Sequence, residues 1–383
     1  MTPSTSELWL DVLDEYFESV EGLTWSVLKR RQNGLTVSLA FGAAGIAYAH
    51  VYAGFHLQDE NLLRRADAWI REASRHEEEP DAFLGRDAEP GMEMPAGAFL
   101  FGLLGLRWVD AWIAEIRRER RRSEALSRFL ETTRLAETGP FLDLYRGVAG
   151  ALSAAAALLK VRRDPRLVDL SRDLLERLEG EARSEDGILT WPGLHGPGLA
   201  HGDVGAHLAL LLGAEALGRT PAPNLGRSLE ALIRRALRDP ASLVREPRRG
   251  WLCNGFAGLA YAAARAHQSL GGDDLLDAAR RSTELVLAHP PLRPDLCCGR
   301  LGVAYACLAV ARQDPTGPWR RHALEHALSA LLCESETWPV VGLYGGEAAL
   351  PCIALDLLSE TDQASLPCLE PGTMTAKALR ATA

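Results

Sequence analysis

Two kinds of helical segment alternate along the chain. The first is apolar on every side and rich in Ala and Leu, as in GLAYAAARAHQSL from Gly258, and this pattern predicts a buried helix. The second, as in LGRSLEALIRRALRD from Leu225, has Arg and Glu on one face and leucines on the other. That pattern predicts an amphipathic helix with one buried face. The alternation therefore predicts an all-α protein whose buried helices are covered by amphipathic ones.

A Gly-x-x-Gly step, or a near copy of it, precedes each buried helix. Seven copies begin 44 to 60 residues apart, at Gly42, Gly102, Gly147, Gly202, Gly255, Gly299 and Gly346. Periods of that size indicate a repeat built from one supersecondary unit per copy. We expect the glycines to allow close backbone approach and free backbone dihedral angles.

Seven buried helices need seven amphipathic helices to cover them. Six lie between the copies, and the stretch from Glu7 to Val20 can supply the seventh. Closure into a ring leaves no terminal repeat exposed, so we predict a single-domain α/α toroid of seven inner and seven outer helices over residues 1–358. An open helical solenoid is the alternative. We expect residues 359–383 to be a poorly ordered tail and residues 76–96 to be an acidic, Pro-rich loop.

Composition and charge narrow the class of function. Of 383 residues, 47% are hydrophobic and 24% charged, as in globular proteins. The net charge of −9 argues against a nucleic-acid partner. No apolar run reaches the roughly 18–20 residues that span a bilayer, and the acidic N-terminus does not resemble a secretory signal. We therefore expect a cytoplasmic protein that does not span a membrane, in which seven cysteines are reduced thiols or metal ligands.

Chemically reactive residues stand just before four of the seven buried helices. They are Asp143, His201, Cys253 and the pair Cys297 and Cys298, each within four residues of the first glycine of its copy. In a toroid, these positions converge at one mouth of the central cavity. The sequence therefore predicts a functional site at that mouth.

Three thiols in this position favour a zinc site. Zinc takes tetrahedral sulfur and nitrogen ligation, and catalytic zinc sites keep three protein ligands and one open position. We predict Cys253, Cys297 and Cys298 as the ligands, although their spacing matches no zinc-finger pattern. The alternative is that they pack as buried apolar residues. We expect that packing role for the other four cysteines, Cys307, Cys333, Cys352 and Cys368.

One histidine is placed to act as a general acid or base at the same mouth. His201 lies between Ala200 and Gly202, which give it little side-chain cover, so it can point into a cavity. An imidazole suits proton transfer near neutral pH. His195 and His207 are the alternatives, and His207 falls within the helix, where a packing role is expected.

Two charged residues complete the predicted site. Asp143 could orient the imidazole of His201, or it could cap the helix that begins near Arg146. Arg249, four residues before Cys253, could pair with Asp143 or with a substrate carboxylate. Arg248 is equally close in sequence and remains an alternative.

The sequence resembles the lanthionine synthetase C family, the lanthipeptide cyclases. The resemblance covers essentially the whole chain, and its most specific pieces are GLAHGDVG, WLCNGFAG, LCCGRLG and GLYGGEAA; FLDLYRGVAG is a weaker match. It implies an α/α toroid with a zinc ion at one end. It also implies the activity, in which a peptide Cys thiol adds to a dehydroalanine or dehydrobutyrine and closes a thioether ring.

The sequence departs from the family pattern in three ways. Cys298 stands where the family usually has His in a Cys-His-Gly step, which implies a three-thiolate site like that of a subset of two-domain synthetases. Asn254 stands where an aromatic residue is often found. The chain lacks a long N-terminal dehydratase or kinase region, so we expect a stand-alone cyclase or the cyclase domain of something larger. The expected partners are a dehydrated precursor peptide and a separate dehydratase or transporter complex.

Two other functions are compatible with these residues. One is the addition of glutathione or another small thiol to dehydroamino acids, and the other is a non-catalytic zinc-bearing scaffold that binds a peptide or a kinase. A glycan- or terpene-processing toroid is disfavoured because the chain has no matching acidic pair or Asp-rich motif. The arginine-rich stretch 117–122 could bind an acidic leader peptide, or it could be a solvated helix face.

Overall fold

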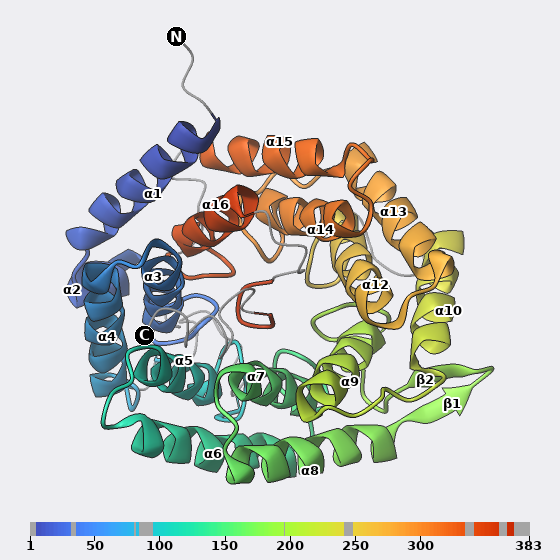
Figure 1. The fold of residues 1–383 in the computed structure, drawn as a ribbon, viewed down its shortest axis with the longest axis horizontal. Coiled ribbons are helices and arrows are strands. Elements are labelled where there is room, and N and C mark those ends of the chain that lie inside the picture. The colour runs from blue at the N-terminus through green and yellow to red at the C-terminus, as the bar shows by residue number, and fades with distance from the viewer. Residues whose placement is uncertain are drawn as a thin grey trace.

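The computed structural model describes residues 5–31, 36–79, 82–83, 95–194, 196–240, 248–333, 341–359 and 366–370. Within these ranges the helices form two concentric rings (Figure 1). The inner ring consists of α3 (Ala43–Leu57), α5 (Leu103–Ile116), α7 (Val148–Val161), α9 (Asp203–Leu217), α12 (Phe256–Leu270), α14 (Arg300–Gln313) and α16 (Leu350–Leu358). The outer ring consists of α1 (Thr5–Glu21), α4 (Glu60–Arg75), α6 (Arg122–Thr138), α8 (Pro165–Glu181), α10 (Leu225–Arg238), α13 (Asp273–Ala288) and α15 (Trp319–Leu331). The predicted α/α toroid, with seven inner and seven outer helices in the described part, is confirmed.

Short elements connect these helices. They are α2 (Trp25–Arg31), the 3-10 helices η1 (Arg248–Gly250) and η3 (Glu347–Ala349), and the strands β1 (Arg183–Glu185) and β2 (Ile188–Thr190). The two strands form an antiparallel hairpin in which Ser184 lies opposite Leu189. None of the described helices combines the length and the apolar character that crossing a bilayer requires.

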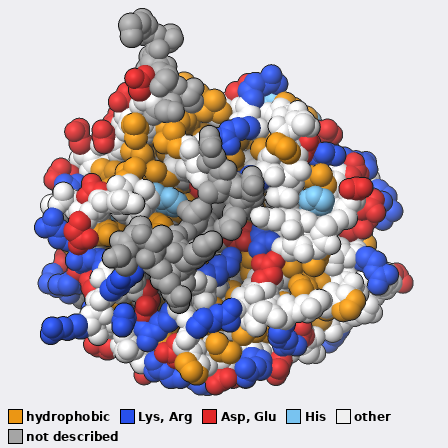
Figure 2. Space-filling view, in the orientation of Figure 1, with side chains coloured by type: hydrophobic (Ala, Val, Ile, Leu, Met, Phe, Trp, Pro, Cys, Tyr) orange, Lys and Arg blue, Asp and Glu red, His pale blue; other side chains and the backbone are white. Residues whose placement is uncertain are grey.

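The two layers differ in burial as the hydrophobic pattern predicts. In α3 every residue from Ala43 to Gly54 is buried, whereas α10 buries one face that includes Leu225, Leu229 and Ile233. The opposite faces of the outer helices carry the charge. On the side of the molecule that Figure 2 shows, acidic and basic side chains are mixed around the rim rather than gathered by sign.

The Gly-x-x-Gly steps are needed for close packing of the loop against the helix that follows it. A Cβ atom on Gly258 would lie 2.1 Å from the carbonyl oxygen of Leu252, and one on Gly255 would lie 2.5 Å from that of Arg248. The φ angle of Gly255 is −129°, an extended value that any residue adopts. Gly255 therefore does not use the freedom of a glycine backbone, and the expected close approach is confirmed at Gly255 and Gly258.

The loops that lead into the inner helices form a closed circle of backbone hydrogen bonds, which we call the backbone hoop. Each loop donates an N–H to a carbonyl of the next: Ala40 to Leu100 (2.8 Å), Phe99 to Tyr145 (3.1 Å), Leu144 to Ala200 (3.1 Å), Ala200 to Cys253 (2.6 Å), Cys253 to Cys297 (3.2 Å), Cys297 to Tyr344 (2.8 Å) and Tyr344 to Ala40 (2.7 Å). The last bond joins the seventh copy to the first. An open solenoid has no such bond, so that alternative is excluded.

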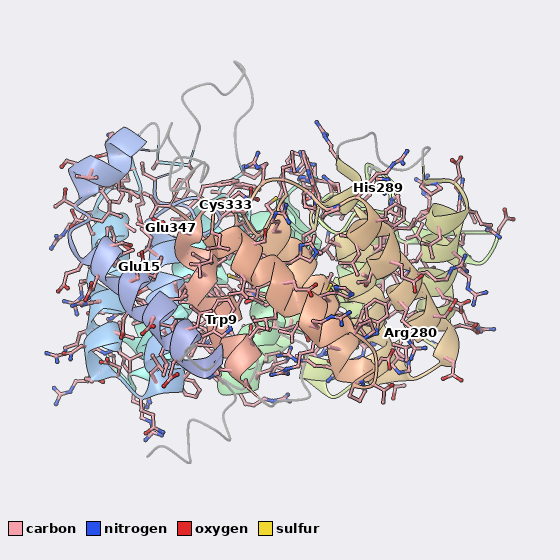
Figure 3. The ribbon with its side chains drawn as sticks, turned by 90° about the horizontal axis from the view of Figure 1, so that it is seen from above. Trp9, Glu15, Arg280, His289, Cys333 and Glu347 are labelled. Carbon is pink, nitrogen blue, oxygen red and sulfur yellow. The ribbon has the colours of Figure 1, made fainter. Side chains whose placement is uncertain are left out.

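Helix packing also joins the first and last repeats. The first outer helix, α1, packs against the last inner helix, α16, and buries Trp9 to 1% exposure. Figure 3, at right angles to Figure 1, looks onto the outer wall where α1 and α15 lie and labels Trp9. The N-terminal amphipathic stretch therefore supplies the seventh outer helix, as predicted.

A short segment near the C-terminus lies inside the ring. Leu366 and Glu370 form an isolated antiparallel bridge, and both are buried. Tyr261 and Arg265 donate hydrogen bonds to the Glu370 carboxylate, and the hydroxyl of Tyr344 donates to the carbonyl of Pro367 (3.0 Å). Residues 366–370 therefore depart from the poorly ordered tail predicted for 359–383. The division into domain and tail stays a prediction, because residues 360–365 and 371–383 lie outside the described residues, as do 80–81 and 84–94 of the predicted acidic loop.

Part of the arginine-rich stretch has a structural role. The Arg121 guanidinium lies between the carboxylates of Asp67 on α4 (2.9 Å) and Asp110 on α5, both of which are buried. Arg117 lies 3.4 Å from Asp67 as well. These ion pairs join neighbouring repeats, so Arg117 and Arg121 are not simply a solvated face.

Candidate metal and acid–base site

Three cysteine sulfurs meet at the mouth of the ring. Cys253 follows η1, and Cys297 and Cys298 end the loop before α14. The Sγ atoms of Cys298 and Cys253 are 3.7 Å apart, those of Cys298 and Cys297 are 3.4 Å apart, and all three lie within 4.8 Å of one another. The hoop bond from the Cys253 N–H to the Cys297 carbonyl holds the two loops in register.

This spacing fits a tetrahedral zinc ion. Zinc–sulfur bonds of about 2.3 Å place two sulfurs of one tetrahedron about 3.8 Å apart. The two thiols of Cys253 and Cys297 are buried, and Cys298 is half-buried, so a fourth ligand can approach from the mouth. The residues present therefore fit three protein ligands and one open position.

The cluster favours a negative charge on one sulfur, that of Cys298, whereas the pKa values of Cys253 and Cys297 are raised by their contacts within the cluster and by burial. Hydrogen bonds from Cys253 and Cys297 lower the pKa of Cys298 to about 4, and the nearby Arg293 guanidinium acts in the same direction. Asp295, fully buried, accepts from the Cys298 backbone N–H (2.7 Å) and from Arg293 Nε (2.7 Å). The thiolate is the form of cysteine that binds metal ions, so a negatively charged sulfur beside two further thiols is typical of a metal-cation site.

Asp143 and His201 form a second cluster at the same mouth. Asp143 is 1% exposed, and its Oδ2 lies 3.2 Å from Nδ1 of His201. The same oxygen accepts from Nε (2.8 Å) and Nη2 (2.6 Å) of Arg146, while Oδ1 accepts from the Arg146 backbone N–H (2.6 Å). Burial raises the pKa of Asp143, but the contacts with His201 and Arg146 outweigh it and hold the pKa below its ordinary value. The carboxylate is therefore charged at neutral pH.

Tyr145 contacts both clusters. Its hydroxyl lies 3.6 Å from Sγ of Cys297, and its ring packs edge-on against His201 with centroids 5.0 Å apart. The loop that bears Asp143 thus brings the acid–base pair next to the thiols.

The structure brings together most of the residues that the sequence singled out. Asp143, His201 and the three cysteines share one mouth, whereas the guanidinium on Asp143 belongs to Arg146 rather than to Arg249. Arg249 lies half-buried in η1, four residues before Cys253. Their roles in binding and catalysis stay predictions.

The alternative residues behave differently. His207 is fully buried, with Nδ1 2.8 Å from the Asp203 carbonyl oxygen and Nε2 2.8 Å from the Ser228 hydroxyl, and burial lowers its pKa to about 4. This is a packing role. His195 lies outside the described residues. The other cysteines are not members of the thiol cluster: Cys307, Cys352 and Cys368 are buried, and Cys333 is half-buried.

Sequence reasoning missed Arg146, Tyr145 and Asp295 as members of the site. The first two stand in the same FLDLYRGVAG stretch as Asp143, and the third stands two residues before Cys297. Their place in the sequence could have indicated them, because all three lie just before a buried helix, within six residues of the first glycine of a copy. Which way each side chain turns was not visible from that position.

A family model described as lanthionine synthetase C-like protein matches residues 35–370. A search among curated proteins finds no match.

Among solved structures, the chain is similar to nisin cyclase. The identity is 16% and the TM-score 0.65, with 92% of this chain and 95% of that chain covered. Two weaker likenesses are a cellobiose 2-epimerase from Bacillus thermoamylovorans (13% identity, TM-score 0.41, 73% and 88% covered) and an α-1,6-mannanase of Salegentibacter sp. (14%, 0.39, 67% and 86%). The likeness to nisin cyclase bears out the toroid fold.

Proposed function

The chain belongs to the lanthionine synthetase C-like family, and from that premise we propose that it is a zinc-dependent lanthipeptide cyclase. Its substrate would be a dehydrated precursor peptide, in which a Cys thiol adds to a dehydroalanine or dehydrobutyrine. A carbon–sulfur bond forms at the β-carbon, the carbon–carbon π bond breaks, and a proton reaches the α-carbon in place of the one lost from sulfur. The reaction needs no oxidant or reductant.

The metal would be held by Cys253, Cys297 and Cys298. A free thiol has a pKa near 8.5, so only a few per cent is thiolate at pH 7. Zinc with an open position, when bound, supplies the charge that deprotonates an incoming thiol. The half-buried Cys298 marks the side of the cluster from which a peptide thiol would approach.

His201 would move the proton. A carboxylate only accepts hydrogen bonds, so the contact with Asp143 keeps a proton on Nδ1 and leaves Nε2 to exchange a proton with the substrate. The side chain is 33% exposed, which lets a peptide reach it. His201 would take the thiol proton, deliver a proton to the α-carbon, or do both in turn.

Asp143 and Arg146 would fix that imidazole. The buried Asp143 carboxylate would orient the imidazole of His201, and the two contacts from the Arg146 side chain would keep the carboxylate in place. Arg146 holds Asp143 in the structure, so a substrate carboxylate stays the predicted partner of Arg249.

One observation carries the proposal: Tyr145 touches both the thiol cluster and the acid–base pair. A thiol activated at Cys297 and its neighbours would therefore have a proton carrier close by. A scaffold that only bound zinc would need neither an accessible histidine nor a buried aspartate to orient it, and this favours a cyclase over the scaffold alternative.

The test uses a synthetic peptide with one Cys and one dehydroalanine. Ring closure leaves the mass unchanged, so free thiols are counted by alkylation and mass spectrometry. The wild-type protein should consume the thiol, and His201→Ala should be slower by about 10²–10⁴-fold with its metal retained. His322→Ala is the matched control, because His322 pairs with Glu325 on the outer wall. A His201→Ala enzyme within threefold of wild type would move the proton-transfer role elsewhere.

A second reaction separates the proposal from small-thiol addition. The same peptide without Cys is incubated with glutathione, and a mass gain reports the adduct. Preferred addition of glutathione over ring closure would replace the peptide cyclase with the alternative enzyme. We further propose that the protein works in the cytoplasm, where it receives its peptide from a separate dehydratase or transporter complex.

A further inference from the structure

Tyr145 is held rigidly between the two clusters of the site. It is 4% exposed, and its carbonyl accepts the hoop bond from Phe99. Its ring packs edge-on against Phe101 (5.3 Å), His201 (5.0 Å) and Tyr344 (6.2 Å), measured between centroids. With the backbone and three sides of the ring fixed, the direction of the hydroxyl is fixed too.

That hydroxyl points at a predicted metal ligand. The Tyr145 oxygen lies 3.6 Å from Sγ of Cys297, within the range of a hydrogen bond that involves sulfur. A phenol keeps its proton at neutral pH. Against a thiolate, which has no proton to give, the Tyr145 hydroxyl can only donate.

A donor at this place matters because of the charge that the ligands bring. Three thiolates on Zn²⁺ give the site a net charge of −1, whereas two thiolates and a neutral imidazole give zero. A substrate thiolate lowers each total by one. A hydrogen bond to one of the ligand sulfurs withdraws part of the extra negative charge, and groups around a metal tune it in this way.

We propose that Tyr145 is a positioning residue that donates a hydrogen bond to the Cys297 thiolate, offsetting the charge of the third thiolate, while its ring holds His201 in place. This inference rests on the proposed zinc centre. It separates the two parts of one side chain: the hydroxyl acts on the metal ligand, and the ring acts on the histidine.

Cobalt substitution tests the hydroxyl directly. Co²⁺ in place of Zn²⁺ shows sulfur-to-cobalt charge-transfer bands, whose energy falls when a thiolate loses a hydrogen bond. In Tyr145→Phe the band should move to longer wavelength, and the zinc dissociation constant, measured by chelator competition, should rise about tenfold. Tyr305→Phe is the matched control, because that buried hydroxyl donates to Asp356 (3.0 Å) instead of to sulfur.

A second pair of variants tests the ring and guards against a folding defect. Tyr145→Leu should show the same band position as Tyr145→Phe but a further loss of cyclisation rate, because only it removes the contact with His201. Fluorotyrosine at position 145 keeps the ring and donates more strongly, so the band should move to shorter wavelength.

The outcomes separate this inference from the proposed function. If wild-type protein binds no zinc or cobalt, the proposed metal centre fails and the inference falls with it. If metal binds and the folded Tyr145→Phe and fluorotyrosine proteins keep the wild-type band and dissociation constant, the role of Tyr145 alone is refuted.

Discussion

Replacing Asp143 with Asn separates orientation of His201 from simple helix capping. Asn has the same shape as Asp but carries one oxygen and one NH₂ group. In the wild type, Oδ2 accepts from His201 and twice from the Arg146 side chain, and Oδ1 accepts from the Arg146 backbone N–H. The oxygen of Asn can fill only one of these two positions.

The structure indicates which position the oxygen takes. If it fills the Oδ1 position, the NH₂ group faces two donors of the Arg146 side chain at 2.8 and 2.6 Å. If it fills the Oδ2 position, the NH₂ group faces a single donor, the backbone N–H at 2.6 Å. The second arrangement has fewer opposed donors, and it still accepts from Nδ1 of His201. The proton should therefore stay on Nδ1.

The magnitudes follow from that arrangement. Hydrogen bonds to charged groups contribute about 1.5–3 kcal/mol and neutral ones about 0.5–1.5 kcal/mol, so the contact with His201 weakens by about 1 kcal/mol. That corresponds to cyclisation slower by about fivefold. Asp143→Ala removes the contact and frees the imidazole, so its rate should fall by about 10²-fold or more. The bond lost at the Arg146 backbone should lower the melting temperature of Asp143→Asn by about 1–2 °C.

Three measurements follow each variant: the rate of thiol loss, the melting temperature, and the His201 tautomer from long-range ¹H–¹⁵N spectra of histidine-labelled protein. Asp164→Asn is the matched control. Asp164 caps α8 and pairs with Arg166 through the same kind of backbone and side-chain bonds, but on an outer helix. It should lose stability and keep full activity.

Two results would refute the reasoning. The first is that Asp143→Asn and Asp143→Ala both cyclise the peptide at the wild-type rate, which would leave Asp143 with helix capping as its only role. The second result is that Asp143→Asn cyclises as slowly as Asp143→Ala and that the His201 proton has moved to Nε2. This would show that the Asn amide takes the other orientation, and that the number of opposed donors does not determine the orientation.

Three further predictions concern the metal and the pH dependence of stability. Cys253→Ala should lower zinc from about one ion per chain to near zero and lower the melting temperature, because bound metal contributes to folding. The control variant Cys333→Ala, on the outer wall (Figure 3), should keep its metal. Full zinc in Cys253→Ala would contradict the ligand set. Cys298→His should keep zinc but slow cyclisation under saturating peptide, because imidazole donates less charge to the metal than thiolate does; a faster enzyme would count against this charge argument. Burial raises the pKa of Asp203 to about 6, above its value of about 3.9 in the unfolded chain, so the folded state binds that proton more tightly and loses stability as the pH rises from about 4 to 6. Asp203→Asn should therefore stabilise the protein at pH 7 by about 3 kcal/mol and change little at pH 4. Equal effects in urea unfolding at both pH values would argue against it.

Repetition made the fold predictable from the sequence. Each copy pairs a wholly apolar helix with an amphipathic one, and such pairs must be covered on both sides. The candidate site was predictable for the same reason, because Asp143, His201 and Cys253 each lie one to four residues before the first glycine of three successive copies. Equivalent positions in a ring lie at one end, whatever the details of packing.

The partners within the site were not predictable in this way. Asp143, Tyr145 and Arg146 are near neighbours in sequence, yet one contacts a histidine, one faces a thiol and one pairs with a carboxylate. Side-chain rotamers in a shared loop decide between these roles, and sequence position does not encode them. The burial of residues 366–370 was missed because it depends on contacts with residues distant in sequence, Tyr261, Arg265 and Tyr344.

Because the backbone hoop is closed and α1 packs against α16, no repeat of the ring is a terminal repeat with an exposed face. In a linear repeat array, a terminal unit can unravel or be deleted while the remaining units stand. Here every unit has a neighbour on both sides, and each turns the wall by about one seventh of a circle, so a chain with six or eight units could not close at the same curvature. Closure of the ring therefore fixes the number of repeats. Four consecutive repeats bear the residues of the candidate site, and the spacing of those residues also depends on the three repeats that contribute no residue to it.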